Sequence, residues 1–412
     1  MARRLRIEIA FGPDNVHPVG QIAWDAARRS AAVEWDPAFL ADPLPISPYH
    51  IKTLAGLYRT GNPAAFEGLP GVFGDSLPDG WGRLLVDREL ERRGAGRDAI
   101  TPVDRLAIVG KHGMGALVYL PEDRSVDPNR VDLEWFADLA TSMDEDASVE
   151  DLSRARAAAG GSAGARPKIV ALLDVETGRL RDHQLAPKQG ERQVLIKYPA
   201  STDSPSAVEE EEAYARMARA AGIAMPWTMV LRTARGDTFL AVERFDRSGA
   251  GRVHMHTAAG LLDVDFRQPS IDYENLLKLV RWTTRHAGDQ YEMFRRMAFN
   301  VLAHNRDDHL KNHAFLMGSD GSWRLSPAYD ISFSGGPGGE HHLAIAGEGR
   351  RPGREHLEAV GRSLGMKPAA IAALIDPIRS AIADWPKHAN AAGVPSRRAL
   401  QIAEYFSAGT SC

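Results

Sequence analysis

The first part of the chain contains short segments in which hydrophobic and polar residues alternate. Residues 5–10 read Leu-Arg-Ile-Glu-Ile-Ala, and residues 32–35 repeat the pattern. Alternation with a period of two is typical of half-buried β-strands. A turn-rich stretch over residues 68–82 follows, and residues 83–90 then predict the opening of a helix. The beginning of the chain therefore predicts short strands followed by a helix.

The middle of the chain combines a loop of small residues with three further apolar segments. Residues 160–165 are all Gly, Ala or Ser, and the apolar run 168–173 follows them. Residues 193–198 and 238–243 also predict strands, because both runs are short, apolar and flanked by turn residues. Small residues allow backbone N–H groups to approach a phosphate closely. The loop matches no standard glycine-rich nucleotide motif, however, and it also suits a flexible linker.

A helix is predicted between these strands, from about residue 208 to residue 222. Its apolar residues Tyr214, Met217, Ala218 and Ala221 keep helical spacing. The helix starts with four glutamates, residues 209–212. We expect three of the four to form a solvated first turn, which the helix macrodipole favours.

From residue 270 onward the pattern is mostly helical. Tyr291, Phe294, Ala298 and Val301 form one apolar stripe, and this helix leads directly into the polar run 305–312. The order of parts is thus a small-residue loop, a strand with a lysine, an acidic helix, a strand, helices and a polar loop. A bilobal kinase has the same order of parts.

Length and composition set broad limits on this interpretation. The 412 residues exceed what one hydrophobic core normally supports, so two or three domains are expected. With 44% hydrophobic and 25% charged residues, the composition is that of a globular protein and not of a disordered one. The net charge of −4 argues against the whole chain being a polyanion binder.

The cysteine content and the apolar runs limit the possible structural bonds and the expected cellular compartment. Cys412 is the only cysteine, which excludes an intramolecular disulfide and a zinc site with cysteine ligands. No run approaches the ~18 apolar residues of a membrane span. Residues 1–6 are basic but lack the apolar run of a signal peptide. We therefore expect a cytoplasmic protein with no membrane partner.

The polar run contains the candidate catalytic residues. Asp307 and Asn312 have the spacing of the aspartate and asparagine in a protein-kinase catalytic loop. In phosphoryl transfer, such an aspartate positions the acceptor hydroxyl and accepts its proton. Asp308 is the rival, but only four positions separate it from Asn312, so we assign the base to Asp307. The spacing alone is common by chance, and both aspartates could instead cap a loop after the preceding helix.

Two residues are candidates to hold Mg²⁺. Asn312 and Asp330 offer the hard oxygen atoms that this cation prefers. Standing alone, Asp330 would more often be an ordinary turn aspartate. Lys311 is either a charge partner for phosphate or a surface lysine. Zinc is less favoured, although three histidines cluster here (His304, His309 and His313), since no suitable Cys or Glu accompanies them.

Lys197 is the candidate contact to the α- and β-phosphates of a nucleotide. It lies in an apolar strand, where a lysine needs a counter-charge. Glu211, on the acidic helix, could supply that charge.

Taken together, these residues resemble the HipA family of serine/threonine kinase toxins. Four stretches carry the resemblance, and they are residues 73–83 (Phe-Gly-Asp-Ser-Leu-Pro-Asp-Gly-Trp-Gly-Arg), 164–168 (Gly-Ala-Arg-Pro-Lys), 242–247 (Val-Glu-Arg-Phe-Asp-Arg) and 307–312 with Tyr329 and Asp330. The resemblance implies an α+β, bilobal protein-kinase-like fold. Residues 1–150 would form a small β-rich N-terminal domain with its connection, 151–247 the kinase N-lobe, and 248–412 a mostly helical C-lobe.

The resemblance also implies the residues of the site. Asp307 would be the catalytic aspartate, and Asn312 and Asp330 would hold Mg²⁺. Contacts to ATP would come from five places in the chain. These are Ala163, Gly164, Ala165, Arg166, Pro167 and Lys168; Lys197; Glu243, Arg244 and Phe245; His309, Leu310, Lys311 and Asn312; and Tyr329 with Asp330.

Partners and regulation follow from the same resemblance. It implies a protein substrate with a Ser or Thr hydroxyl, an aminoacyl-tRNA synthetase being among the family's targets. It also implies a small helix-turn-helix antitoxin, through which DNA would mainly be contacted. The position of the family's regulatory serine is Gly161 here, with Ser162 one place later. Two alternatives stay open, namely a lipid or small-molecule kinase with the same site and a non-catalytic co-repressor with the antitoxin on DNA.

Overall fold

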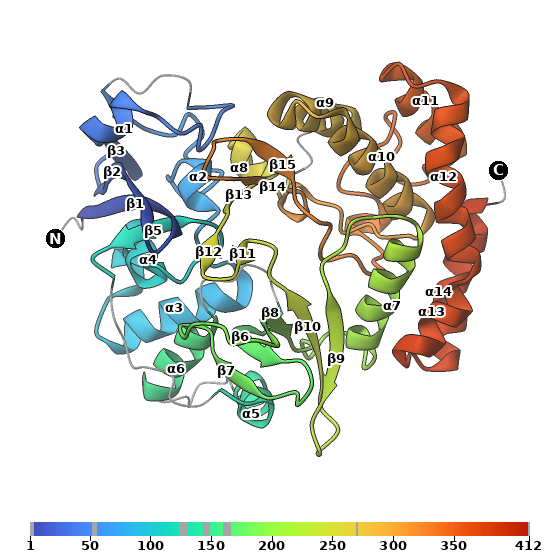
Figure 1. Ribbon diagram of the computed structural model, residues 1–412, viewed down its shortest axis with the longest axis horizontal. Helices are drawn as coiled ribbons and strands as arrows, with labels where there is room; N and C mark the ends of the chain where they lie inside the picture. Colours follow the sequence, from blue (N-terminus) through green and yellow to red (C-terminus); the bar gives the residue numbers. More distant parts are fainter. Residues whose placement is uncertain are drawn as a thin grey trace. The chain divides into compact units, whose positions relative to one another are not determined.

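The structure is a computed structural model of the chain, and it describes residues 4–51, 56–122, 131–142, 149–159, 166–268 and 271–410. The chain folds into two compact units. The first comprises Met1–Thr202, Leu231–Val264 and Leu316–Ser322, and the second comprises Asp203–Val230, Asp265–Phe315 and Trp323–Cys412. Each unit is described by itself below. Figure 1 labels the helices and strands.

The first unit begins with an antiparallel sheet in the strand order β4-β3-β2-β1-β5. Alternation in the sequence explains the interior strand β1, because Leu5, Ile7 and Ile9 are fully buried while their neighbours are more exposed. The strands are β1 (Arg4–Gly12), β2 (Asn15–Asp25), β3 (Ser30–Trp35), β4 (Leu57–Tyr58) and β5 (Leu117–Leu120). The helices of this region are α1 (Pro37–Ala41), α2 (Gly71–Gly74), α3 (Gly80–Arg92), α4 (Pro102–Val109), α5 (Leu133–Ser142) and α6 (Val149–Ala159), with the 3₁₀ turn η1 (Arg97–Ala99).

A second sheet in the same unit carries the predicted lysine strand. Its strands follow the order β7-β6-β8-β10, and β6 pairs with β8 in an antiparallel register that places Lys168 opposite Lys197. The strands are β6 (Lys168–Asp174), β7 (Leu180–Asp182), β8 (Glu191–Lys197) and β10 (Thr238–Glu243), while β9 (Thr228–Arg232) leads from one unit into the other. The short elements β11 (Arg247–Ser248), β12 (Gly251–Arg252), β13 (His254–Thr257) and α8 (Ala258–Leu262) complete the region.

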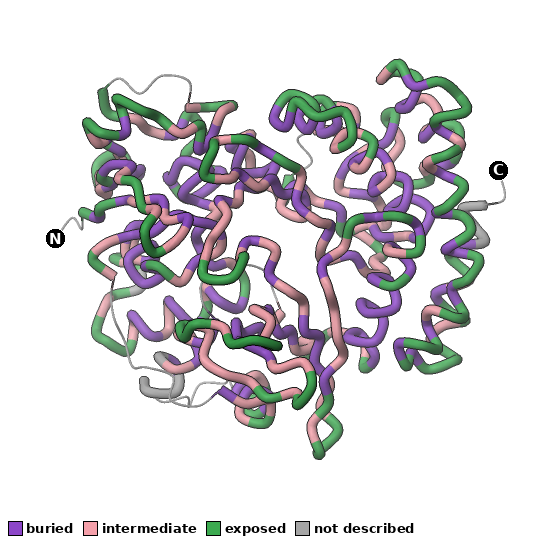
Figure 2. The backbone as a smooth tube through the Cα atoms, in the orientation of Figure 1, coloured by how far each residue is buried: buried purple, intermediate pink, exposed green. Residues whose placement is uncertain are grey.

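The second unit is mostly helical. Tyr214 of α7 is fully buried, and its ring lies 6.4 Å from Phe299 of α10 and 5.4 Å from Trp385 of α13. Its hydroxyl donates to the carbonyl oxygen of Ala303 at 2.7 Å. Figure 2 shows the buried faces of these helices in purple. The elements are α7 (Ala207–Ala220), α9 (Tyr273–Thr284), α10 (Ala287–Leu302), α11 (Arg354–Ser363), α12 (Pro368–Ala383), α13 (Trp385–Ala392) and α14 (Ser396–Thr410), with η2 (Leu310–Asn312), η3 (Pro337–Gly339) and β15 (Trp323–Leu325). The strand β14 (Ala314–Met317) has residues in both units.

Most predicted elements are confirmed, but the acidic turn of α7 differs from expectation. Glu209, Glu210, Glu211 and Glu212 are each no more than 6% exposed. The expectation that three of them are solvated is therefore wrong. The physical reason is that basic side chains reach this turn, for example Arg398 at Glu210 and Arg216 at Glu212.

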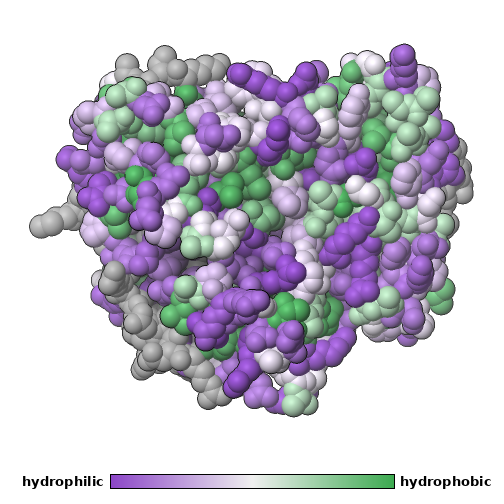
Figure 3. Space-filling model, viewed as in Figure 1, coloured by the Kyte–Doolittle hydropathy of each residue, from purple (hydrophilic) through white to green (hydrophobic). Residues whose placement is uncertain are grey.

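The hydropathy of the surface and the length of the helices indicate whether a described helix could span a membrane. Figure 3 shows hydrophilic residues over much of the face in view, with smaller hydrophobic areas between them. Among the described residues, no helix is long and apolar enough to cross a bilayer.

Candidate functional site

The polar run 305–312 leaves the end of α10 beside a second loop of the same unit. His304, directly after the helix cap, has a left-handed backbone with φ of +54°. The amide of Ser334 donates to the carbonyl oxygen of His304 at 3.1 Å, and the amide of Arg306 donates to that of Ser334 at 3.4 Å. These backbone contacts hold the loop after Asp330 against the loop that carries Asp307.

Asp307 and Asp308 differ completely in their surroundings. The side chain of Asp307 is 54% exposed, whereas that of Asp308 is fully buried. Asp308 accepts hydrogen bonds from the hydroxyl of Tyr273, from Nδ1 of His341 and from the amide of His342, each at 2.8 Å. Burial acts to raise the pKa of Asp308, but the hydrogen bond and charge of His341 outweigh it, so the pKa lies below its ordinary value. Asp308 thus organises the loop, and Asp307 presents its carboxylate outward.

Asn312 supports the backbone of Asp307. Its side-chain Nδ2 donates to the carbonyl oxygen of Asp307 at 2.8 Å, and its own amide donates to the carbonyl oxygen of His309 at 2.9 Å within the turn η2. Because the NH₂ group of this carboxamide is used on the loop, its oxygen Oδ1 is the atom suited to a cation.

The loop of Asp330 is fastened to the same turn. The hydroxyl of Tyr329 donates to the carbonyl oxygen of Lys311 at 2.6 Å, and Asp330 has a left-handed φ of +53°. Burial lowers the pKa of His309, and the negative charge of Asp330 is among the influences that oppose this shift. Across the described ranges no three His, Cys, Asp or Glu side chains form a metal-binding group. The donor set at hand is one amide oxygen and one carboxylate, which fits Mg²⁺ completed by phosphate and water.

Two histidines flank the exposed carboxylate. Nε2 of His309 and Nε2 of His342 each lie 3.7 Å from Oδ1 of Asp307, and the two rings meet edge to face at 5.4 Å. Burial lowers the pKa of His309, partly opposed by the charge of Asp307. Phe266 packs against His309 at 4.8 Å and lies beneath the ammonium of Lys311 at 4.9 Å. Neither His342 nor Phe266 was predicted as a site residue, because neither belongs to the polar run.

In the first unit, two lysines face each other across β6 and β8. Lys168 and Lys197 are register partners, with 4% and 6% exposure. Facing residues of antiparallel strands project from the same side of a sheet. The pair therefore places two lysine side chains on one side of the sheet, which suits contact with phosphate groups. Ala163, Gly164 and Ala165, which were predicted to contact ATP, lie outside the described residues, whereas Arg166 and Pro167 lie within them. Glu211 belongs to the other unit, and its pairing with Lys197 stays a prediction.

The predicted nucleotide segment 243–245 is held by its own neighbours. Glu243 pairs with Arg192 at 2.6 Å, and the backbone amide of Arg244 donates to the carbonyl oxygen of Gln193 at 2.8 Å. The guanidinium of Arg244 donates to both carboxylate oxygens of Asp246, at 3.0 and 2.8 Å. The amide and side chain of Arg244 are thus used within the protein, so a nucleotide contact from this residue would fall to its carbonyl oxygen.

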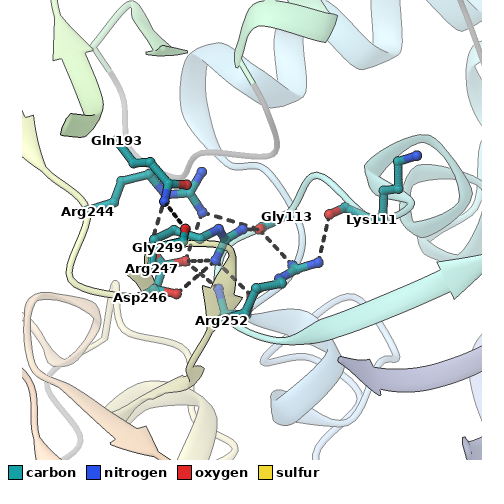
Figure 4. Close-up of polar contacts among 9 residues, drawn as sticks. Lys111, Gly113, Gln193, Arg244, Asp246, Arg247, Gly249 and Arg252 are labelled. Carbon is teal, nitrogen blue, oxygen red and sulfur yellow. Dashed lines mark hydrogen bonds and ion pairs between the residues drawn. The ribbon is translucent and has the colours of Figure 1, made fainter. Parts of the chain in front are cut away.

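Asp246 is the centre of a buried polar cluster, drawn in Figure 4. It is fully buried and also accepts from Arg247 at 2.7 Å and from the amide of Gly115 at 2.7 Å. Burial acts to raise the pKa of Asp246, but the charges of Arg244 and Arg247 lower it well below its ordinary value. The carbonyl oxygen of Gly113 accepts from Arg244, Arg247 and Arg252. Sequence reasoning did not find this cluster, because its two parts lie about 130 residues apart.

The signature at residues 73–83 contributes a second buried network. Nε2 of His256 lies 3.0 Å from Oγ of Ser47, and its Nδ1 lies 2.6 Å from Oδ2 of Asp75. Asp75 also accepts from the amide and hydroxyl of Thr257. The order resembles a Ser-His-Asp triad, but Ser47 and His256 are 3% and 0% exposed. A substrate would not reach such a serine, so we interpret the network as structural.

Comparison with known proteins shows which family models and which relatives match this chain. The model of the HipA-like C-terminal domain matches residues 160–386, and that of the HipA N-terminal domain matches residues 15–120. A candidate kinase of Sinorhizobium fredii (strain NBRC 101917 / NGR234), Y4mE, is 26% identical over 295 residues, which are 67% of this chain and 67% of that protein. A candidate kinase of Haemophilus influenzae (strain ATCC 51907 / DSM 11121 / KW20 / Rd) is 26% identical over 151 residues, 33% of this chain and 44% of that protein.

A solved structure has the same fold. HipA of Shewanella oneidensis MR-1, solved in complex with HipB and operator DNA, matches with a TM-score of 0.68 at 17% sequence identity. The match covers 98% of this chain and 95% of that one. The expected α+β, kinase-like bilobal fold class is thereby confirmed. Because the C-terminal family model alone spans more than half of the chain, this protein belongs to the HipA family.

Proposed function

We propose that this protein is a Mg-ATP-dependent kinase that phosphorylates a serine or threonine hydroxyl of a protein. The observation that carries the proposal is the contrast between Asp307 and Asp308. One carboxylate is exposed on a loop braced by Asn312, and the other is buried in the support of that loop. An exposed carboxylate on a fixed loop can orient a hydroxyl and accept its proton as the phosphoryl group leaves the nucleotide.

Each remaining residue has a defined role in this proposal. Oδ1 of Asn312 and the carboxylate of Asp330 would hold Mg²⁺, which neutralises phosphate charge during transfer. Lys197 would bind the α- and β-phosphates, with Lys168 beside it. Residues 163–168, the backbone of Glu243–Phe245, the turn His309–Asn312 and Tyr329 would complete the ATP contacts. His309 and His342 would keep the carboxylate of Asp307 in place.

We further propose that the protein is the toxin of a toxin–antitoxin pair in the cytoplasm. The Shewanella HipA of the same fold was solved with HipB and operator DNA, which supports an antitoxin and DNA as partners. Following the family resemblance, the antitoxin would be a small helix-turn-helix protein, and DNA would be contacted mainly through it. A translation-related protein such as an aminoacyl-tRNA synthetase is the proposed substrate, following the family resemblance.

The test compares purified wild type with Asp307→Asn in a cell lysate containing Mg²⁺ and γ-labelled ATP. The variant keeps the Asn312 contact, since that contact is made to the backbone of residue 307. We expect label in protein, as phosphoserine or phosphothreonine, and a loss of ~10²-fold or more in the variant. Asp376→Asn, an exposed aspartate of α12, is the matched control.

Two outcomes would contradict the proposal. Label found only in lipid or small-molecule fractions would favour the other kinase class. Growth inhibition that survives in Asp307→Asn, with ATP still bound, would favour the non-catalytic co-repressor.

A further inference from the structure

The C-terminal helix α14 (Ser396–Thr410) lies beyond residue 386, where the match to the HipA-like C-terminal domain ends. It nevertheless contacts three elements of the second unit that carry or adjoin proposed site residues. Two of its side chains, Arg398 and Tyr405, make these contacts. Arg398 and Tyr405 can affect catalysis only if the residues that they contact position the proposed site.

Tyr405 belongs to a group of three packed rings, here called the aromatic trio (His304, Phe333 and Tyr405). The ring of His304 stacks on Phe333 at 5.6 Å with an interplanar angle of 15°. Tyr405 packs against both rings, at 4.8 Å from His304 and 4.9 Å from Phe333. His304 is three residues before Asp307, and Phe333 is three residues after Asp330. The trio therefore connects residues next to two loops, the loop that carries the proposed catalytic residue Asp307 and the loop that carries the proposed cation ligand Asp330.

Both loops contain backbone strain close to the trio. His304 and Asp330 are non-glycine residues in the left-handed conformation, with φ of +54° and +53°. Such a conformation persists only where surrounding contacts hold it. Phe333, which stacks on His304, and Tyr405, which packs against it at a tilt, supply this restraint at His304. The backbone contacts of Ser334 to His304 and Arg306 carry it from one loop to the other.

Arg398 extends the connection to α7. Its Nε and Nη2 donate to the two carboxylate oxygens of Glu210, each at 2.9 Å, and Glu210 also accepts from the hydroxyls of Ser204 and Ser206. The same guanidinium lies over the ring of Phe333, 5.4 Å from its centroid. A bidentate pair fixes orientation as well as distance. Arg398 thus ties the first turn of α7, which bears Glu211, to the aromatic trio.

We propose that Tyr405 and Arg398 are positioning residues for phosphotransfer, acting through the two loops and α7. This inference rests on the proposed kinase function, because the loops are assigned to catalysis there. Loss of the Tyr405 ring should let the loop of Asp307 move, and a displacement of about 1 Å at a catalytic group can cost ~10²-fold in rate.

The experiment compares Tyr405→Ala, Tyr405→Phe, Arg398→Lys and Leu400→Ala in the full-length chain, well below the melting temperature of each. Tyr405→Phe keeps the ring, and Arg398→Lys keeps the charge but loses the bidentate geometry. Leu400 is 69% exposed on the same helix and serves as the control. The readouts are kcat, the KM for ATP, and hydrogen–deuterium exchange of peptides covering residues 304–312 and 329–334.

We expect Tyr405→Ala to lower kcat by at least about tenfold with little change in the KM for ATP, and to speed exchange in both peptides. Arg398→Lys should give a smaller loss of the same kind, while Tyr405→Phe and Leu400→Ala should resemble wild type. The inference is overturned if Tyr405→Ala matches Leu400→Ala in kcat and exchange. If instead Asp307→Asn is as active as wild type, the proposed function fails, and the exchange data alone decide whether the helix restrains the loops.

Discussion

Asn312 holds the backbone of Asp307 through a hydrogen bond of 2.8 Å from its side-chain amide. One carboxamide thereby combines two tasks, since its nitrogen braces the loop and its oxygen is suited to a cation. The two tasks can be separated by substitution.

Asn312→Asp keeps an oxygen donor but removes the NH₂ group that braces the loop, whereas Asn312→Ala removes both. We expect kcat to fall by ~10²-fold or more in Asn312→Ala, the scale of one positioned group. The Asp variant should keep more activity at high Mg²⁺. A titration of kcat against Mg²⁺ concentration checks this. Equal losses and equal Mg²⁺ dependence in both variants would mean that Asn312 does not contact the cation.

Asp308→Asn is expected to act on stability. The side chain is fully buried and accepts from Tyr273, His341 and His342, so the neutral amide leaves mismatched donors. Breaking such a buried network costs about 3 kcal/mol. Urea unfolding should show this loss, and Asp307→Asn should not, because the Asp307 side chain is half exposed. A fully stable but inactive Asp308→Asn would instead point to Asp308 as the base.

Substitution of either lysine of the Lys168–Lys197 pair is expected to weaken the binding of ATP. Lys168→Ala and Lys197→Ala should each weaken ATP binding about tenfold or more, since a hydrogen bond to a charged group is worth about 1.5–3 kcal/mol. Because the two are register partners, the double variant should lose less than the sum of the single losses. Calorimetric titration with ATP and Mg²⁺ measures this, with the exposed Lys188→Ala as control. Wild-type affinity in Lys197→Ala would remove it from the phosphate site.

Stability is expected to fall in mild acid because buried histidines remain neutral. Burial lowers the pKa of the fully buried His254 from 6.5 to about 4. The unfolded chain then takes up a proton that the folded chain does not, so stability is complete above pH 6.5 and declines as the pH falls toward 4. One pKa unit is worth about 1.4 kcal/mol, so this group contributes a loss of about 3 kcal/mol. Urea unfolding of wild type and His254→Gln at pH 7.5 and 5 should show a smaller pH dependence in the variant. An equal dependence in both would exclude His254 as a source.

Much of the fold was predictable because it depends on local patterns. The alternation at residues 5–10 and the helical spacing of Tyr214, Met217 and Ala218 each report burial directly. The spacing to Asn312 also favours Asp307 over Asp308 as the base, and this assignment stays a prediction; the structure adds that Asp307 is exposed and Asp308 is buried.

The failures have a common physical cause. Glu210 was expected in solvent because its partner Arg398 lies 188 residues away. His342 and the Asp246 cluster were missed for the same reason. Pairings of charged or polar side chains across such separations leave no periodicity in the sequence, so only the folded chain shows them.

The loop Lys111–Gly115 finally limits how this protein can be divided. Its carbonyl oxygens receive Arg244, Arg247 and Arg252, and its Gly115 amide donates to Asp246. Separating the N-terminal region from the lysine strands would leave the guanidinium groups of Arg244, Arg247 and Arg252 with Asp246 as their carboxylate but without the carbonyl oxygens of this loop. Such a fragment would have to hydrate or rearrange that cluster to survive. A fragment or chimaera of this protein should therefore keep residues 111–115 together with residues 244–252.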